Sequence, residues 1–429
     1  MLNHTSGIRD YYDLRILKGL SDDYLYTDAD LRKLLINQTY LNFTPGEKYL
    51  YSNSGYWFLG QIVNKVSGNN LADFARKEIF EPLGMKNTHF HNDHTQIVKN
   101  RAIGYVPNGK GIYKMSTIII DVIGAGGIYT SIKDIKKWDE AYYNSTILSK
   151  TFWKEMTKQG VLNNGKVIDY ASGLWIEKYK GLKTIRHGGA FVGLRTVFIR
   201  FPEEHLSIAI FANREDANTL RKAYQIADIL LKGKLIENVD KEDKKQETKA
   251  PTEEFKLNQL TGIYEIQPGE LVKISTKNDS LNVFEISKGA SYNIYRTSGN
   301  TFKKPGRKDL SFVFSDLQEG HTQAVSAFQG GIGVKAVRIN DVDVSGRNLN
   351  DYTGSYYSKE LDVIYKFEIE NGNLKMRIED NPSTMGCTIG GIDQFAMEWG
   401  LVRFQRTNGL ISGFEIDAGV IKNLKFEKK

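Results

Sequence analysis

Hydrophobic residues recur at helical spacing along much of the first half of this 429-residue chain, and at every second position along its second half. A helix is predicted after residue 53 by apolar residues at positions i, i+3, i+4 and i+7, namely Leu59, Ile62, Val63 and Val66. Asn53 or Ser54 can cap its start, and Gly68 stands where it should end. Further helices are predicted at 28–35, 70–81, 131–142 and 220–230.

The spacing changes to alternation at about residue 183, which is typical of half-buried strands. One strand is expected to end at His187, and a hairpin to follow through Arg195 to Phe201. The next strand is expected where Leu206, Ile208 and Ile210 alternate with polar residues. Beyond residue 258 the pattern is one of short alternating stretches with glycine and asparagine turns, so this half is expected to be all β.

Two short sequences recur within the β-rich half, and their offsets are 92 and 93 residues. The pairs are Leu260-Thr261-Gly262-Ile263-Tyr264 with Tyr352-Thr353-Gly354-Ser355-Tyr356, and Asn278-Asp279-Ser280-Leu281 with Asn371-Gly372-Asn373-Leu374. This repeat predicts two small β-barrels, at 259–345 and 346–429. Residues 236–258 are expected to be a linker, because seven acidic and five basic residues lie between Glu237 and Lys256 with almost nothing apolar to bury.

Candidate chemistry begins at Tyr51-Ser52-Asn53, which follows a Pro-Gly turn and stands at the front of the predicted helix. A phenol and a carboxamide two residues apart can point into one cleft. The phenol can take or give a proton, and the amide can hold a substrate carbonyl. Taken alone, such a triplet is more often a turn followed by a helix cap, so the functional interpretation depends on what surrounds it.

Several further motifs match one family. They are His187-Gly188-Gly189, Asn3-His4-Thr5-Ser6-Gly7-Ile8, Gly124-Ala125-Gly126-Gly127 and the stretch from Asp134 to Trp138. Together with the Tyr-x-Asn triplet, this set resembles the serine β-lactamase and penicillin-binding-protein family in its class C, D-peptidase and esterase branch. The resemblance covers about residues 1–235. It implies an α+β fold, in which an antiparallel sheet has flanking helices. A domain of this kind followed by two barrels resembles the arrangement of the D-aminopeptidases in this family.

The family's first motif, Ser-x-x-Lys on a buried helix, is absent, because no serine of the chain has a lysine three positions on. In family members that helix precedes the His-Thr-Ser-Gly stretch, which here begins at His4. The expectation is therefore a domain that lacks its N-terminal part and its nucleophile, and that is inactive as this chain.

The resemblance implies a role for each matching residue. Tyr51 and His187 would be catalytic, while Asn53 would hold the substrate's carbonyl. Gly188, Gly189 and Ala190 would bind substrate, with the backbone N–H of Ala190 forming half of the oxyanion hole. Since a histidine is mostly neutral at pH 7 where the family's penicillin-destroying members carry a lysine, His187 favours a peptidase or esterase.

Composition narrows the alternatives. The 58 basic and 51 acidic residues are well mixed and give a net charge of +7, so nucleic-acid binding is not expected. No apolar stretch approaches the length of a membrane span, no signal peptide is visible, and the single Cys387 excludes an internal disulfide. By resemblance the protein would be periplasmic or secreted, and cytoplasmic if the chain truly starts at Met1.

Two alternatives stay open at this point. Three histidines and an aspartate within His89-Phe90-His91-Asn92-Asp93-His94 could converge on zinc, although a surface loop without metal or cofactor is favoured. A non-catalytic module that binds peptides or cell-wall fragments is the alternative to a serine hydrolase acting on small peptides or esters. The oligomeric state is undetermined.

Overall fold

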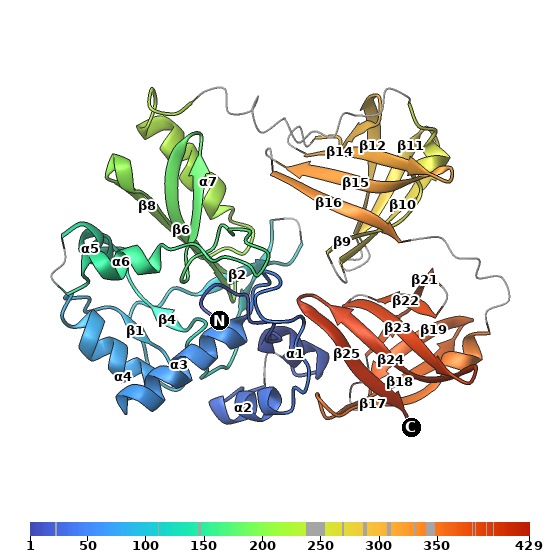
Figure 1. The fold of residues 1–429 in the computed structure, drawn as a ribbon, viewed down its shortest axis with the longest axis horizontal. Coiled ribbons are helices and arrows are strands. Elements are labelled where there is room, and N and C mark those ends of the chain that lie inside the picture. The colour runs from blue at the N-terminus through green and yellow to red at the C-terminus, as the bar shows by residue number, and fades with distance from the viewer. Residues whose placement is uncertain are drawn as a thin grey trace. The chain divides into compact units, whose positions relative to one another are not determined.

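The structure is a computed structural model, and it describes all residues except 22–23, 110, 145–146, 237–253, 268–269, 286–289, 307–309, 330–331, 340–347, 380, 382, 392 and 398. The chain divides into two compact units (Figure 1). Unit 1 contains Met1–Tyr12, Leu20–Ile36 and Phe43–Val239, and unit 2 contains Asp13–Gly19, Asn37–Asn42 and Asp240–Lys429. The predicted linker lies for the most part outside the described residues, and the domain boundaries stay predictions.

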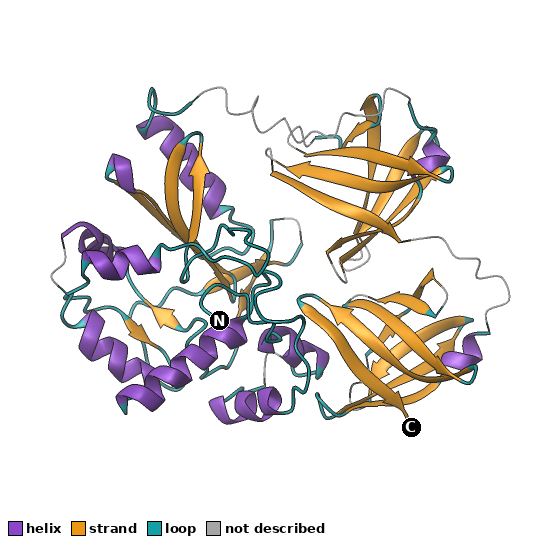
Figure 2. Cartoon of the chain, viewed as in Figure 1, coloured by secondary structure: helices purple, strands orange, loops and turns teal. Residues whose placement is uncertain are grey.

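Helices and strands mix in the first part of the chain, whereas strands dominate from residue 262 on (Figure 2). The helical elements up to residue 230 are α1 (Tyr11–Leu17), α2 (Asp28–Ile36), α3 (Asn53–Ser67), α4 (Leu71–Ala75), η1 (Arg76–Phe80), α5 (Ile132–Asn144), α6 (Lys150–Met156), η2 (Pro202–Glu204) and α7 (Thr219–Leu230). Two small antiparallel pairs join β1 (His89–Phe90) to β4 (Ile128–Tyr129) and β2 (Gly104–Pro107) to β3 (Tyr113–Ser116). No described helix is long and apolar enough to cross a membrane.

The helix predicted after residue 53 is present as α3, but its buried face differs from its aliphatic stripe. Ser52 caps the start, and Gly68 ends the helix with φ +72°. Ile62 is 46% exposed and Val66 is 82% exposed, whereas Trp57 is 1% exposed. The indole N–H of Trp57 donates to Asp28 Oδ1 (2.6 Å), so an aromatic residue with a polar partner, and not the aliphatic stripe, faces the interior.

Four antiparallel strands form the main sheet of unit 1, in the order β5 (Trp175–Tyr179), β6 (Leu182–Phe191), β7 (Leu194–Phe201) and β8 (Leu206–Ala212). Helix α7 packs on it through a cluster that includes Val197, Ile199, Ala223 and Ala227. The expectation that a strand ends at His187 is wrong, because β6 continues to Phe191 and its glycines stay paired with β7. The reversal comes at Val192 and Gly193, whose φ values are +40° and +72°.

Unit 2 contains a closed antiparallel barrel of eight strands. A short 3-10 helix η5 (Leu257–Leu260) precedes it, and its strands are β9 (Gly262–Gln267), β10 (Glu270–Lys277), β11 (Ser280–Glu285), β12 (Ala290–Ser298), β13 (Thr301–Lys303), β14 (Leu310–Gln318), β15 (His321–Gln329) and β16 (Ile332–Ile339). Its interior is filled by a buried cluster that includes Leu260, Tyr264, Phe302 and Phe314. The barrel is therefore packed with side chains.

The following strands form a nine-stranded barrel-like sheet in the order β20-β19-β18-β17-β25-β24-β23-β22-β21. After η7 (Leu349–Tyr352) come β17 (Gly354–Ser358), β18 (Val363–Glu370), β19 (Asn373–Ile378), β20 (Thr384–Gly386), β21 (Thr388–Gly391), β22 (Gln394–Met397), β23 (Gly400–Thr407), β24 (Leu410–Ala418) and β25 (Ile421–Lys428). Rings of Tyr356, Phe367, Phe404 and Phe414 meet in its interior. The predicted architecture, an α+β domain with an antiparallel sheet followed by two barrels, is confirmed.

The sequence repeat corresponds to a repeated structure at the start of each barrel. Tyr264 donates its hydroxyl hydrogen to the carbonyl of Leu260 (2.9 Å), and Tyr356 donates to the carbonyl of Tyr352 (2.7 Å). A cation from the barrel's last strand lies over each ring, Arg338 at 5.9 Å from the Tyr264 centroid and Lys428 at 5.5 Å from the Tyr356 centroid.

Glycine is needed two residues before each of these tyrosines. Gly262 has φ +150° and Gly354 has φ +126°. A Cβ on Gly262 would lie 2.8 Å from Arg338 Cζ, and one on Gly354 would lie 3.2 Å from Lys428 Cε. The Gly-x-Tyr motif thus makes room for the cation that closes over the tyrosine.

Unit 2 also includes the two short segments from early in the chain. Glu360 Oε1 accepts hydrogen bonds from the backbone N–H groups of Thr39 (2.7 Å) and Tyr40 (3.2 Å). Asn42 Nδ2 donates to the carbonyl of Val420 (2.8 Å), and the N–H of Lys422 donates to Asn42 Oδ1 (2.8 Å). The segment Asn37–Asn42 is therefore part of the packing of the nine-stranded sheet.

Candidate active site

The Tyr51-Ser52-Asn53 triplet is held by the cap of α3 and by a buried carboxylate. Ser52 is the N-cap, with extended backbone (φ −146°, ψ 114°), and its hydroxyl accepts from the N–H of Gly55 (3.4 Å). Asp10 Oδ2 accepts from the backbone N–H of Asn53 (2.5 Å) and from Asn53 Nδ2 (2.8 Å). A carboxylate at the first turn also suits the positive end of the helix. The direction of Tyr51 is thus set by α3 and by Asp10.

His187 lies on β6, at the point where that strand extends beyond the end of its neighbour β5. The last pair between β5 and β6 is Trp175 with Arg186, whereas β6 pairs with β7 up to Phe191. In the sheet, His187 to Phe191 therefore pair on one side only. Backbone N–H groups on the other side of this edge are positioned to donate to a bound molecule.

Tyr51 and His187 lie together although 136 residues separate them in the sequence. Their ring centroids are 6.5 Å apart with an angle of 39° between the planes. Gly188, Gly189 and Ala190 follow on β6, opposite Val197, Thr196 and Arg195 of β7. Asn53 stands at the start of α3 with its amide bound to Asp10. The catalytic and binding roles of these six residues stay predictions.

Two residues that the sequence analysis did not assign to the site connect its parts. The N–H of Ser52 donates to His4 Nδ1 (3.1 Å), and His4 Nε2 lies 3.2 Å from the hydroxyl of Tyr170. The same hydroxyl lies 3.0 Å from His187 Nε2, and His187 Nδ1 lies 2.7 Å from the carbonyl oxygen of Gly188. His4 had been quoted only as part of a family landmark, and no spacing in the sequence singles out Tyr170.

The site is aromatic and largely withdrawn from water. His4 and Tyr170 are each 1% exposed. The ring of His4 lies 4.0 Å from that of Tyr51 and 5.2 Å from that of Tyr56, and Tyr49 contacts both Tyr170 and Trp175. Buried imidazoles in such surroundings favour their neutral forms.

Burial shifts the proton affinities accordingly. It lowers the pKa of His4 to about 4, and the charges of His187 and the N-terminus contribute in the same direction. The pKa of His187 is also lowered, mainly by burial and to a lesser extent by Arg186. Burial raises the pKa of the Tyr51 phenol, with the carboxylate of Asp10 adding to the effect. At pH 7 both histidines are therefore neutral and Tyr51 keeps its proton.

The hydroxyl of Tyr51, unlike that of Tyr170, is available to bond to a molecule that enters the site. Among the described residues, the Tyr51 hydroxyl forms no hydrogen bond, whereas Tyr170 contacts two imidazoles. A half-buried phenol without an internal partner can give a proton to, or take one from, a group that enters the site.

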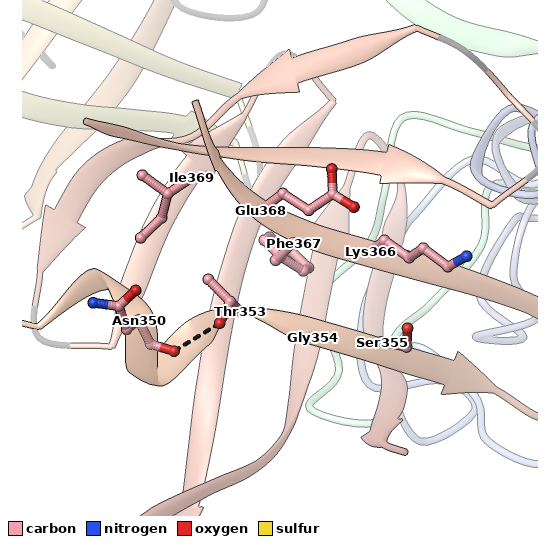
Figure 3. Close-up of a pocket in the computed structure, with 8 residues that line it drawn as sticks. All are labelled: Asn350, Thr353, Gly354, Ser355, Lys366, Phe367, Glu368 and Ile369. Atoms are coloured by element: carbon pink, nitrogen blue, oxygen red, sulfur yellow. Dashed lines mark hydrogen bonds between the residues drawn. The ribbon is translucent and has the colours of Figure 1, made fainter. Parts of the chain in front are cut away.

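Two other candidate places are less equipped for chemistry. His89 and His91 lie side by side, with ring centroids 5.7 Å apart, but no group of three or more His, Cys, Asp or Glu side chains in the described part of the chain is placed to hold a metal ion. A surface hollow on the nine-stranded sheet (Figure 3) is lined by Asn350, Thr353, Gly354, Ser355, Lys366, Phe367, Glu368 and Ile369. Its charged side chains already pair, Lys366 with Glu379 (2.9 Å) and Glu368 with Arg377 (3.1 Å).

Comparison with known proteins decides the family. The profile described as Beta-lactamase matches residues 1–231, which hold the whole of the site above. The chain belongs to the beta-lactamase family. The resemblance seen in the sequence is thereby confirmed, and residues 1–231 are called the beta-lactamase domain below.

Relatives of known sequence include Penicillin-binding protein 4* of Bacillus subtilis, 26% identical over 310 residues, or 66% of this chain and 65% of that protein. A D-aminopeptidase of Gluconobacter oxydans is 24% identical over 230 residues, or 54% of this chain and 44% of that protein. A D-aminopeptidase of Cereibacter sphaeroides is 23% identical over 381 residues, or 87% of this chain and 67% of that protein. The chain thus spans between 44% and 67% of the length of these three relatives.

Among solved structures, the octameric penicillin-binding protein homologue from Pyrococcus abyssi is similar with a TM-score of 0.49 and 20% identity. That match covers 79% of this chain and 77% of the other.

Proposed function

We propose that the beta-lactamase domain carries the substrate-binding and proton-transfer part of a serine hydrolase site, and that its substrates are amides, small peptides or esters of D-amino acids. The observation that carries the proposal is the meeting of Tyr51 with His187 at the free edge of β6. The two D-aminopeptidases among the relatives support the choice of substrate.

The chemistry follows from what each group offers. A serine oxygen attacks the carbonyl carbon, and its proton passes to a neighbouring base. The Tyr51 hydroxyl, which has no hydrogen-bond partner among the described residues, can later give a proton to the leaving amine or alcohol. Because N–H groups face alternate edges along a strand, only alternate ones of residues 188–190 face the free edge of β6, where they can donate to the carbonyl oxygen as it gains negative charge.

The family's nucleophile motif, Ser-x-x-Lys, does not occur in these 429 residues, since no serine has a lysine three positions on. Loss of the nucleophile usually leaves only the rate enhancement that binding and the oxyanion hole provide, about 10³ to 10⁴ over the reaction in water. We therefore infer that the 429-residue chain by itself hydrolyses D-amino-acid amides very slowly or not at all.

The test compares the 429-residue chain with a version extended at its N-terminus by a Ser-x-x-Lys segment from a family member. We expect the extended chain to hydrolyse D-alanine p-nitroanilide faster than the L-isomer. Tyr51→Phe should lower kcat by about 10² to 10⁴, and the matched control Tyr49→Phe should change it little.

A folded extended chain that hydrolyses neither isomer would overturn the proposal. If such a chain still binds D-alanyl peptides in calorimetry, the result favours the alternative hypothesis, a non-catalytic module that binds peptides or cell-wall fragments.

A further inference from the structure

The four hydrogen bonds that join Ser52 to Gly188 admit one arrangement of protons when both histidines are neutral. A backbone N–H can only donate, so His4 Nδ1 must accept from Ser52 and carry no proton. The proton of neutral His4 is then on Nε2, which donates to the oxygen of Tyr170.

The other end of the chain is fixed in the same way. A backbone carbonyl can only accept, so His187 Nδ1 must carry the proton that it shares with the carbonyl oxygen of Gly188. His187 Nε2 is then bare and accepts the single hydroxyl hydrogen of Tyr170. Tyr170 thus accepts from one imidazole and donates to the other, and the four bonds run in one direction from Ser52 to Gly188.

We propose that Tyr170 is a positioning residue of the beta-lactamase site, which joins His4 and His187 in the opposite tautomers that Ser52 and Gly188 impose, and so ties the Tyr51-Ser52-Asn53 turn to β6. The proposal deepens the function proposed above, because it concerns the same site. It also changes the role expected of His187, both of whose ring nitrogens already have partners within the chain. His187 would then affect the substrate indirectly, by holding β6 and Tyr51 in position. The Tyr51 hydroxyl, which has no hydrogen-bond partner among the described residues, remains the group that reacts.

The surroundings of Tyr170 fit a fixed hydroxyl. Its ring is 1% exposed and packs edge-on against Trp175 (5.1 Å) and Tyr51 (6.4 Å). The titratable and charged groups around the two histidines are the phenols of Tyr49, Tyr51 and Tyr56, the N-terminal amine and Arg186. The nearby cations lower the pKa of the histidines, and burial does so more strongly, so the neutral pair that the bonds require is also the favoured pair.

The direct test is nitrogen NMR of the histidine side chains in the full 429-residue chain at pH 7, with His4→Gln and His187→Gln used to assign the signals. We expect His4 protonated on Nε2 and His187 protonated on Nδ1. The same tautomer at both positions, or a charged imidazole at either, would overturn the proposal. This measurement needs no catalysis, so a failure to hydrolyse substrate and a failure of the tautomer assignment are separate results.

A variant then tests whether the hydroxyl of Tyr170 helps to keep His187 neutral. Tyr170→Phe removes the donor to His187 Nε2, and a lost hydrogen bond to the neutral form should raise the titration midpoint of His187 by about 0.5 to 1 pH unit. The matched control Tyr49→Phe removes a hydroxyl from the same aromatic cluster, keeps the ring against His4 and Tyr170, and should leave both histidines unchanged.

An unchanged titration midpoint of His187 in a folded Tyr170→Phe chain would show that the Tyr170 hydroxyl does not hold this imidazole, and would overturn the positioning role. If Tyr170→Phe does not fold, the tautomers of the unmodified protein still decide the proposal, because they are predicted residue by residue.

Discussion

Tyr264 and Tyr356 in the barrels and Tyr170 in the beta-lactamase domain are each at most 1% exposed, yet their hydroxyl groups bond to different kinds of partner. In the barrels the hydroxyl donates to a backbone carbonyl four residues back. In the beta-lactamase domain it lies between the imidazoles of His4 and His187. A buried hydroxyl needs a partner in both places, but only the imidazoles can change charge near neutral pH.

The comparison separates two uses of the same side chain. A bond to a backbone carbonyl does not depend on pH, so the barrel tyrosines should contribute constant stability. A bond between two neutral imidazoles holds only while the imidazoles stay neutral, so the Tyr170 network should couple the stability of the beta-lactamase domain to pH.

Truncation of a barrel tyrosine should have the largest effect. Tyr264→Ala and Tyr356→Ala each remove a fully buried aromatic ring, which typically costs about 3 to 5 kcal/mol. The measurement is urea denaturation of the full chain. Tyr295→Ala serves as the matched control, because Tyr295 is on the same barrel as Tyr264 but is 45% exposed, and it should change the free energy of unfolding by no more than about 0.5 kcal/mol. Equal small effects of all three variants would contradict the packed interiors described above.

Acid should destabilise the beta-lactamase domain by the next largest amount. Above pH 6.5, His4 is neutral in both folded and unfolded chains. Between pH 6.5 and 4 the unfolded chain binds a proton at this position and the folded chain does not, because the folded pKa is about 4. His4 alone should therefore remove about 3 kcal/mol of stability as pH falls through this window, with little further loss below it.

The measurement for this second prediction is the melting temperature of the beta-lactamase domain between pH 7.5 and 4. His4→Gln should flatten the dependence, while Tyr356→Phe in the barrel should leave it as it is. The pKa values of the buried His91 and the partly buried His89 are also lowered, so a double His89→Gln, His91→Gln variant measures their separate share. The pKa of His187 is lowered as well, so a pH dependence that survives the replacement of His4, His89, His91 and His187 by Gln would contradict the assignment to these histidines.

Local patterns predicted the elements well, and the reasons are physical. A polar cap, the apolar spacing and Gly68 predict where α3 begins and ends, and Gly262 and Gly354 mark the start of each barrel. Each of these signals acts within a few residues of the chain. The buried face of α3 was not predictable from local sequence. Trp57 is buried with its indole N–H bonded to Asp28, which lies 29 residues earlier in the chain.

The site was predictable only where a motif carried it. Tyr51, Asn53 and His187 could be proposed because they occur in recognisable triplets. His4 and Tyr170 meet across 166 residues, and neither the spacing nor the chemistry of the surrounding sequence signals that contact. The extension of β6 past His187 was missed because glycines usually interrupt strands, whereas here Gly189 faces the side chain of Thr196 at a distance that admits no Cβ.

Gly262→Ala and Gly354→Ala compare the two barrel starts. Both positions have a positive φ that disfavours a side chain, and the new Cβ at Gly262 would also press on Arg338 at 2.8 Å. We expect a loss of about 1 to 3 kcal/mol for Gly262→Ala. The loss for Gly354→Ala should be smaller, since the end of Lys428 can move away. Gly386→Ala, where the nearest atom is Lys375 Nζ at 3.7 Å, is the control in urea denaturation. A larger loss at Gly354 than at Gly262 would contradict this expectation and show that movement of Lys428 does not relieve the contact.

The smallest expected effect is also the most specific, and it concerns the hydroxyls of the two barrel tyrosines. Tyr356→Phe leaves the carbonyl of Tyr352 without its donor, a loss of about 1 kcal/mol. Tyr264→Phe should cost about 2 kcal/mol, because the hydroxyl also bonds to Thr322 Oγ1 (2.7 Å), which is fully buried. The difference should disappear in a Thr322→Val background, where Tyr264→Phe should again cost about 1 kcal/mol. A double-mutant cycle measured by urea denaturation gives that coupling directly. If the coupling is zero, the extra cost at Tyr264 comes from packing around its ring, and the hydroxyls of the two barrels are used in the same way.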